Sequence, residues 1–295
     1  MTRIIEIPVN TMPASVLPKR AETPVIDIVP HKKWRVLDFN ELWAYRELLA
    51  FLCWRDVKVR YKQTVLGGAW AILQPLMTMI VFSIFFAKLA NLSSGRIPYP
   101  LFAFAGLLPW TFFANAISAA GQSVVGSERL ISKVYFPRLI IPLASVGAGL
   151  VDFAVACGML GVLMFAYGVF PSTSLVLAPV IVLGLTVAAA GVGSLLAALN
   201  VAYRDFRYVI PFLMQLWMFA TPTIYMDSTS LASGVWSWIL PLNPAFGLIA
   251  NFRAVVLGGT LDTYSLAVSL AVSAAMFAVG TLYFSRVERG FADII

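Results

Sequence analysis

The stretch "RDVKVRYKQTVLGGAWAILQPLMTMIVF", which runs from Arg55 to Phe82, joins a densely basic segment directly to an apolar one. After Lys62 no charged residue follows until Lys88. A helix that crosses a membrane needs about 20 mainly apolar residues, and its cytoplasmic end collects Lys and Arg. The stretch therefore predicts a first membrane-spanning helix whose basic end lies at the cytoplasmic surface.

The composition of the whole chain places it among membrane proteins. Of its 295 residues, 60% are hydrophobic and only 12% are charged, about half the charged fraction of a soluble domain. Residues 1–40 are polar and rich in proline, without an apolar run that could form the core of a signal peptide, so the first spanning helix is expected to direct insertion. The net charge of +7 comes from basic residues that flank the apolar runs, so nucleic acid is not an expected partner.

Charge-free runs divide the chain into six predicted spans. Two of them come from one long apolar run, 139–203, which the turn sequence "FPSTS" at 170–174 divides. The predicted spans cover residues 63–86, 97–127, 139–169, 175–203, 208–226 and 263–285. Between the last two, residues 227–262 are rich in Pro and Gly yet apolar, which favours short helices that re-enter the outer face of the membrane. The predicted fold is therefore an all-α membrane protein.

The basic residues predict the orientation of these spans. Six spans place both termini on one side, and all but three of the 21 Lys and Arg residues fall on that side. The exceptions are Lys88, Arg96 and Arg253. Because Lys and Arg favour the cytoplasmic side, both termini are predicted to be cytoplasmic.

Residues 38–62 are predicted to form an amphipathic helix in the membrane interface, between an N-terminal cytoplasmic tail (1–37) and the spanning domain (63–285). Asp38 and Glu41 have the spacing of a capping box at its start. Apolar residues recur at helical spacing, at Leu42, Tyr45, Leu49 and Leu52, with Trp43 and Trp54 beside them. This apolar face is expected to lie in lipid, and a soluble helix packed on a partner is the alternative. Residues 286–295 are expected to form a C-terminal cytoplasmic tail.

The sequence lacks the motifs of common catalytic and metal sites. It has no P-loop of the form GxxxxGK[ST], no HExxH and no Cys/His cluster. Cys53 and Cys157 suggest neither a disulfide nor a metal site, and the single histidine, His31, lies in the polar tail. No catalytic residue, metal ligand or cofactor is therefore predicted in this chain, so either energy comes from elsewhere or the protein is not a pump.

Two polar features inside the spans leave alternatives open. Asp152 is the only acidic residue expected within a span, where a carboxylate is costly unless it is paired or hydrated. It is expected either to bond Ser, Asn or Tyr groups of other spans, which is the favoured alternative, or to contact hydroxyl groups of a ligand. Pro75 frees a backbone carbonyl that a nearby polar side chain such as Gln74 can help to satisfy, and a gating role and a packing kink are equally compatible with it.

Six motifs, in the same order along the chain, resemble those of the membrane subunit of type-2 ABC polysaccharide exporters, a family that moves O-antigen, capsule or teichoic-acid chains. They are "WRDVKVRYKQTVLGGAWAILQPLMTMIVFSIFF" (54–86), "GLLPWTFFANAI" (106–117), "KVYFPRLIIPL" (133–143), "LVDF" (150–153), "NVAYRDFRYVIPFLMQLWMFATPTIY" (200–225) and "LNPAFGLI" (242–249). The resemblance covers residues 41–290 and leaves the first forty outside it.

The resemblance implies a homodimer of this subunit in the inner membrane, together with two copies of a separate cytoplasmic ATPase that binds ATP and magnesium. It implies that this chain is not itself an enzyme and that the cargo is a lipid-linked polysaccharide. A type-2 ABC exporter of a lipid or a drug is the main alternative. A membrane-embedded glycosyltransferase is disfavoured because acidic residues are scarce at the membrane face, and a passive channel would be revealed by flux without ATP.

Aromatic and amide side chains in the spans are expected to line the path of the glycan, because sugar rings stack on aromatic faces and their hydroxyls need polar partners. The candidate channel residues are Trp110, Phe112, Phe113, Asn115, Trp217, Phe219 and Tyr225, with Gln74, Gln122 and Gln215 as further amides. The alternative for Trp and Tyr near the span ends is the interfacial aromatic belt.

The polar connector after the second span, 126–138, corresponds in the family to the coupling helix, which sits in a groove of the ATPase. The resemblance therefore assigns the ATPase contact to Glu128, Arg129, Ser132, Lys133 and Tyr135. The alternative is an ordinary connector that is anchored by its positive charge.

Overall fold

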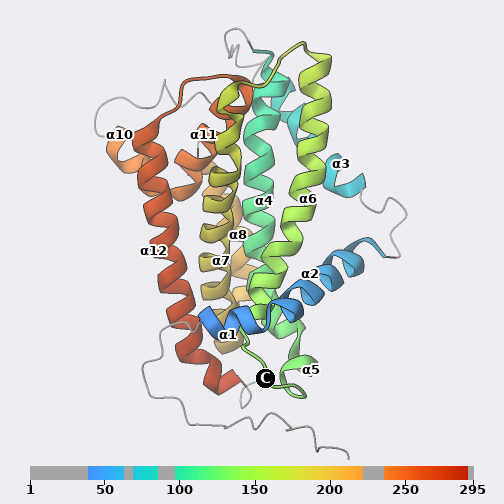
Figure 1. Cartoon of the computed structure of the whole chain (residues 1–295), viewed down its shortest axis with the longest axis vertical. Coiled ribbons are helices and arrows are strands. Elements are labelled where there is room, and N and C mark those ends of the chain that lie inside the picture. Colours follow the sequence, from blue (N-terminus) through green and yellow to red (C-terminus); the bar gives the residue numbers. More distant parts are fainter. Residues whose placement is uncertain (1–38, 63–68, 86–96, 222–235, 292–295) are drawn as a thin grey trace, which may run out of the picture. The chain divides into compact units, whose positions relative to one another are not determined.

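The computed structural model describes residues 39–62, 69–85, 97–221 and 236–291, and every regular element in these ranges is a helix (Figure 1). The α-helices are α1 (Phe39–Ala44), α2 (Arg46–Tyr61), α3 (Trp70–Phe82), α4 (Tyr99–Gly126), α5 (Glu128–Ile131), α6 (Ile140–Ala166), α7 (Ala178–Ala202), α8 (Phe206–Phe219), α10 (Trp236–Ile239), α11 (Pro244–Leu257) and α12 (Thr263–Val287). Short 3-10 helices follow at η3 (Thr173–Leu177), η5 (Leu240–Leu242) and η6 (Glu288–Gly290). The all-α prediction is therefore confirmed for these residues.

Four helices in the described ranges, α4, α6, α7 and α12, are long and apolar enough to cross a membrane. Their bounds agree within a few residues with the predicted second, third, fourth and sixth spans. Helices α3 and α8 lie where the first and fifth spans are predicted, but they comprise 13 and 14 residues. The count of six spans therefore stays a prediction, and four helices of the described ranges have the length and apolar composition of a span.

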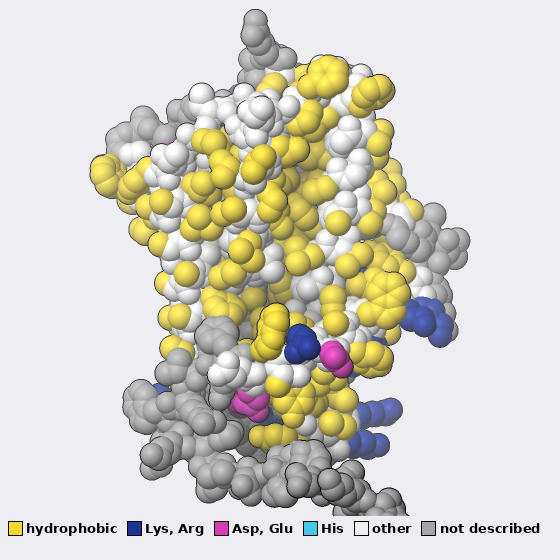
Figure 2. All heavy atoms as spheres, in the orientation of Figure 1, with side chains coloured by type: hydrophobic (Ala, Val, Ile, Leu, Met, Phe, Trp, Pro, Cys, Tyr) yellow, Lys and Arg dark blue, Asp and Glu magenta, His cyan; other side chains and the backbone are white. Residues whose placement is uncertain are grey.

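Helix α4 is the centre of the bundle. It packs against α3, α6, α7, α8 and α11. Of its most apolar stretch 78% is buried, whereas the other three long helices bury between 28% and 39% of theirs. The outer helices thus keep apolar faces for lipid, as expected of spanning helices that are covered on one side only. Figure 2 shows this on one face, where hydrophobic and uncharged side chains cover the bundle and the visible Lys and Arg side chains gather in its lower part.

Small residues let α7 and α12 approach closely. A Cβ atom added to Gly280 would lie 1.9 Å from the carbonyl oxygen of Gly191, and one added to Gly191 would lie 2.5 Å from the backbone nitrogen of Phe277. Helices in membranes associate through such small-residue contacts, because lipid supplies no hydrophobic force between them. The two glycines therefore position α12 on the bundle.

The amphipathic segment forms α1 and α2, but its apolar stripe does not face lipid. Leu42, Tyr45, Leu49 and Leu52 pack against an apolar cluster at one end of the bundle. This basal cluster, as it is called below, consists of the buried residues Leu52, Val124, Ile131, Phe136, Leu139, Ile140, Ile141, Ala144, Ala197, Ala198, Val201, Phe284 and Phe291. The expected lipid contact of the stripe is wrong, because α2 lies along α6 and covers it. The exposed large apolar side chains of the segment are instead Trp43, Phe51, Trp54 and Val59.

Helices α10 and α11 occupy the predicted region of short helices before the last span. Nearly all residues of α11 are buried, and the helix packs against α4, α7 and α12. Pro244 begins α11, and Gly258 ends it with a φ of 79°, a left-handed conformation that glycine adopts without strain. Burial inside the protein explains why this segment is apolar although it contains Pro and Gly. Its entry from the outer membrane face stays a prediction.

Candidate functional site

The connector after α4 presents its polar residues outward. Ile131 and Phe136 are buried in the basal cluster and hold the segment against the bundle. The five candidate coupling residues, Glu128, Arg129, Ser132, Lys133 and Tyr135, are all exposed. The Tyr135 ring is 79% exposed. Tyr and Arg are enriched on surfaces that another protein covers, and both residue types are exposed here. The arrangement suits a docking surface, and the coupling role itself stays a prediction.

The connector is also tied to the C-terminal end of α12. The Arg138 guanidinium donates a hydrogen bond to the backbone carbonyl of Glu288. Beyond it, the rings of Phe284 and Phe291 meet edge to face, with their centroids 5.4 Å apart. Connector, α2 and the end of α12 therefore contribute residues to one packed base.

The six candidate channel residues that the structure describes fall into separate groups. Trp110 and Phe113 are buried inside the protomer, and Phe113 meets Trp217 edge to face at 5.1 Å between centroids. This burial favours a packing role for both rings. Phe219 and Asn115 are exposed, Phe112 lines a cavity described below, and Tyr225 lies outside the described residues. Contact of any of them with cargo stays a prediction.

Asn243 fastens α8 to the start of α11, and the sequence analysis did not single it out beyond its motif. Its side-chain nitrogen donates to the Ala220 carbonyl at 3.2 Å and to the Thr221 hydroxyl at 2.9 Å. Its side-chain oxygen accepts from the Trp217 indole at 2.9 Å and from the Ala245 amide at 3.1 Å. One side chain thus caps α11 and orients a candidate channel residue. "LNP" is an ordinary capping sequence, so no sequence signal indicates the second role.

A cavity of 310 Å³ lies where α2, α3, α4 and α6 meet. Residues that the sequence analysis named come together in it: Gln74, Pro75, Phe112, Asn115 and Asp152. Further lining residues were not predicted, among them Arg60, Tyr61, Trp70 and Thr111. The cavity combines aromatic rings, amides, a carboxylate and a guanidinium, and aromatic walls with a few polar groups are typical of small-molecule sites.

Asp152 finds its partners on α2. The Arg60 guanidinium and the Tyr61 hydroxyl both donate hydrogen bonds to its carboxylate, and Arg60 forms an ion pair with it. Burial, followed by the hydrogen bond and negative charge of Asp152, raises the pKa of Tyr61 to about 12, so the phenol keeps the proton that it donates at neutral pH. A bond to a tyrosine was among the alternatives expected for Asp152, whereas the arginine was not.

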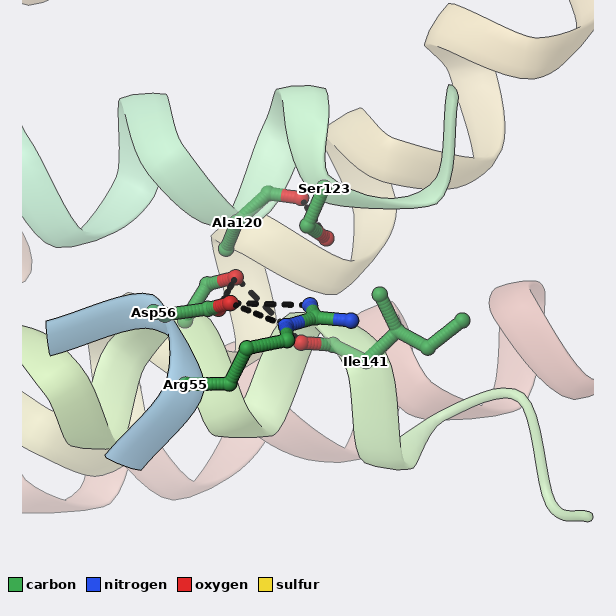
Figure 3. Close-up of polar contacts among 6 residues, drawn as sticks. Arg55, Asp56, Ala120, Ser123 and Ile141 are labelled. Carbon is green, nitrogen blue, oxygen red and sulfur yellow. Dashed lines mark hydrogen bonds and ion pairs between the residues drawn. The ribbon is translucent and has the colours of Figure 1, made fainter. Parts of the chain in front are cut away.

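The middle of α2 is held to α6 as well. Arg55 and Asp56 form an ion pair at 2.8 Å, and the Ser145 hydroxyl of α6 donates to Asp56 at 3.2 Å. Figure 3 shows Arg55 and Asp56 facing each other beside Ile141. A Cβ atom added to Gly147 would lie 3.2 Å from the Cys53 sulfur, which shows how closely the two helices approach. The basic run is thus partly neutralised within the protomer.

Replacing Asp152 by alanine removes its ion pair with Arg60 and is expected to destabilise the chain by about 1–3 kcal/mol. This value lies between those of exposed and buried ion pairs, because the side chains of Asp152 and Arg60 are partly accessible. Arg60→Ala should cost a similar amount. The double variant should cost less than the sum of the two, since either change alone breaks the same interaction. The measurement is unfolding of the purified chain in a denaturing-detergent titration. Additive losses would show that the pair contributes nothing.

Comparisons with known proteins find similarity over most of the chain. The family described as ABC-2 type transporter matches residues 47–257. An O-antigen export system permease protein RfbA of Myxococcus xanthus is 34% identical over 259 residues, which are 87% of this chain and 98% of the relative. An RfbA protein of Klebsiella pneumoniae is 29% identical, over 84% of this chain and 95% of the relative. The polysialic acid transport protein KpsM of Escherichia coli is 23% identical, over 78% and 87%.

Proposed function

The chain belongs to the ABC-2 type transporter family, and from this premise we propose that it is the permease subunit of an ATP-driven exporter that moves a polysaccharide of the O-antigen or capsule type across the inner membrane. The observation that carries the proposal is the match over nearly the whole length of the RfbA proteins, which are named O-antigen export permeases. The weaker match to a polysialic acid transport protein agrees with a glycan as cargo.

Energy comes from a separate subunit. The chain has no P-loop, so ATP and magnesium bind to a cytoplasmic ATPase, of which two copies join a homodimer of this chain. The exposed connector residues around α5 support this assignment, because they offer a partner an aromatic ring and charges of both signs on a base packed against the bundle. The cargo is a lipid-linked polysaccharide. A lipid or drug exporter of the same superfamily is the alternative.

The proposed orientation places both termini in the cytoplasm, and cysteine labelling tests it. In a variant whose Cys53 and Cys157 are alanines, Thr173→Cys and Thr260→Cys should react with a membrane-impermeant maleimide in intact cells. Ser132→Cys should react only after the cells are opened. All three residues are exposed in the protomer. Because Ser132 also belongs to the proposed ATPase contact, its labelling is compared in strains with and without the ATPase, so that lack of reaction in intact cells reports the side of the membrane. Labelling of Ser132→Cys in intact cells would overturn the orientation.

The proposed function is tested by an in-frame deletion of the gene in its native host. The deletion should remove the polysaccharide from the cell surface and leave lipid-linked polysaccharide in the cytoplasm, and the intact gene should reverse both effects. Deletion of the partner ATPase gene should give the same phenotype. Normal surface polysaccharide with altered membrane lipids or altered drug tolerance would instead support the alternative.

A further inference from the structure

The cavity between α2, α3, α4 and α6 offers groups that recognise carbohydrate, and we propose that in each protomer it is a subsite for one uncharged sugar residue of the exported chain. The proposal rests on the proposed function and deepens it, because it assigns a place within the protomer where cargo is held. The arguments are the aromatic wall, the unsatisfied amides, the charge balance and the size of the cavity.

One wall is aromatic and accessible. Trp70 begins α3, lines the cavity and is 51% exposed, so its side chain is accessible. Behind the cavity, Phe112 and Phe153 pack with their centroids 5.3 Å apart and are almost fully buried. The rigid inner rings close the cavity, while the open indole provides the apolar surface on which the C–H face of a sugar ring can lie.

The hydroxyl groups of a sugar also need hydrogen-bond partners. Side chains of the cavity that have unused donors and acceptors can provide them. Gln74 and Asn115 are exposed to the cavity, and within the part of the chain that the structure describes no hydrogen bond involves either side-chain amide. Each amide can both donate and accept, as a sugar hydroxyl can. Asp152 accepts from Arg60 and Tyr61 and still has lone pairs for a further donor.

The unpaired amides of Gln74 and Asn115 lie beside the middle of an apolar helix, where polar groups need a partner. Asp152 lies near the middle of α6, a helix that is long enough to cross the membrane. Polar groups at membrane depth are costly unless water, protein or a polar ligand satisfies them. On this proposal the polar ligand that satisfies the pocket is a sugar residue of the cargo.

The charge and the volume of the cavity limit which ligands can bind in it. The charged side chains of the lining, Arg60 and Asp152, neutralise each other, so an uncharged sugar disturbs neither, whereas an acidic sugar would compete with Asp152 for Arg60. The volume of 310 Å³ is at the lower end of the roughly 300–1,000 Å³ of small-molecule sites. The cavity thus suits one sugar residue and excludes a folded oligosaccharide.

Protection of a cysteine in the cavity tests the proposal in the intact transporter. In the background without Cys53 and Cys157, Asn115→Cys is labelled with a membrane-permeant maleimide in two strains, one that makes the polysaccharide and one blocked at the first step of its synthesis. The partner ATPase carries a variant that cannot hydrolyse ATP, so the cargo stays bound. Labelling should be at least about fivefold slower in the strain that makes the polysaccharide. The cysteine can react only while the subsite is empty, and a well-occupied subsite is empty for a minority of the time.

Matched controls separate occupancy from indirect effects. Thr173 is exposed and does not line the cavity. Thr173→Cys should therefore react equally in both strains. Gln74→Cys repeats the measurement from α3 if Asn115→Cys fails to assemble. In the background with active ATPase, Trp70→Ala should slow export several-fold, while Trp70→Phe should retain most of it, because a phenyl ring keeps a stacking face.

Equal labelling of the cavity cysteines in the two strains would overturn the subsite. The proposed function would still stand in that case, provided that the deletion strain lacks surface polysaccharide. Normal surface polysaccharide in the deletion strain would instead remove the proposed function, so the two failures are distinguishable. Protection at Thr173→Cys equal to that at Asn115→Cys would also count against the subsite, because it would report a general change in the transporter.

Discussion

Gly280→Ala is expected to leave almost no folded protein in the membrane. The added methyl carbon would meet the Gly191 carbonyl oxygen at 1.9 Å, which is well inside contact distance. Because the obstacle is backbone and not the end of a flexible side chain, α7 and α12 would have to separate along their whole contact. We expect a loss of about 3 kcal/mol or more, beyond the usual cost of overpacking a core. The measurement is the monodisperse fraction and thermal stability of the chain in mild detergent.

Gly158→Ala is the matched control for this prediction. Gly158 also lies within a spanning helix, α6, but a Cβ atom there would meet nothing within 4 Å. Alanine has the higher helix propensity, so this variant should be as stable as the parent or gain up to about 1 kcal/mol. If Gly280→Ala were as stable as Gly158→Ala, the close approach of α7 and α12 would not be a determinant of the fold.

Reversing two charges on the connector, Glu128→Lys with Lys133→Glu, should reduce export of the polysaccharide at least about tenfold. Both side chains are exposed, so the fold should be unchanged. The net charge of the connector is also unchanged, so the chain should still insert into the membrane in the same orientation. A docked partner, however, would meet each charge in the wrong place, and like charges across an interface cost several kcal/mol. The readouts are copurification of the ATPase, its hydrolysis rate and surface polysaccharide in one strain.

An exchange of charges on another connector is the control. Arg204 and Asp205 are exposed between α7 and α8, and Arg204→Asp with Asp205→Arg again leaves the net charge unchanged. This variant should export at near the normal rate. If it abolished export while the reversal at 128 and 133 did not, the ATPase contact would lie at the second connector. If neither had an effect, the basic run from Arg55 to Lys62 would become the better candidate.

The spans could be predicted because the membrane leaves few choices. In hydrocarbon every backbone group must be bonded within the segment, so a long uncharged run has to be helical. The bounds of α4 and α12 agree closely with the predicted spans 97–127 and 263–285, and the turn that divides α6 from α7 lies where Pro and Ser/Thr interrupt the run. These are local properties of the chain.

The faces of the helices were less predictable. The stripe from Leu42 to Leu52 was expected to lie in lipid, but it packs on the basal cluster. Trp110 and Phe113 lie inside the protomer, which the sequence did not indicate, and their contact with cargo stays a prediction. Helical spacing shows that one face is apolar, and a membrane protein has two apolar surroundings, lipid and its own core. Periodicity therefore cannot tell which of the two a face meets.

Asp152 separates what the sequence determined from what only the tertiary structure decided. The sequence determined that a carboxylate within an apolar helix needs a partner, because an unpaired charge at that depth is costly. The identity of the partners followed from the way α2 lies along α6, which brings Arg60 to a residue 92 positions away. That course depends on close contacts such as the one between Cys53 and Gly147. No local pattern encodes them, since each contact exists only once two distant helices have packed.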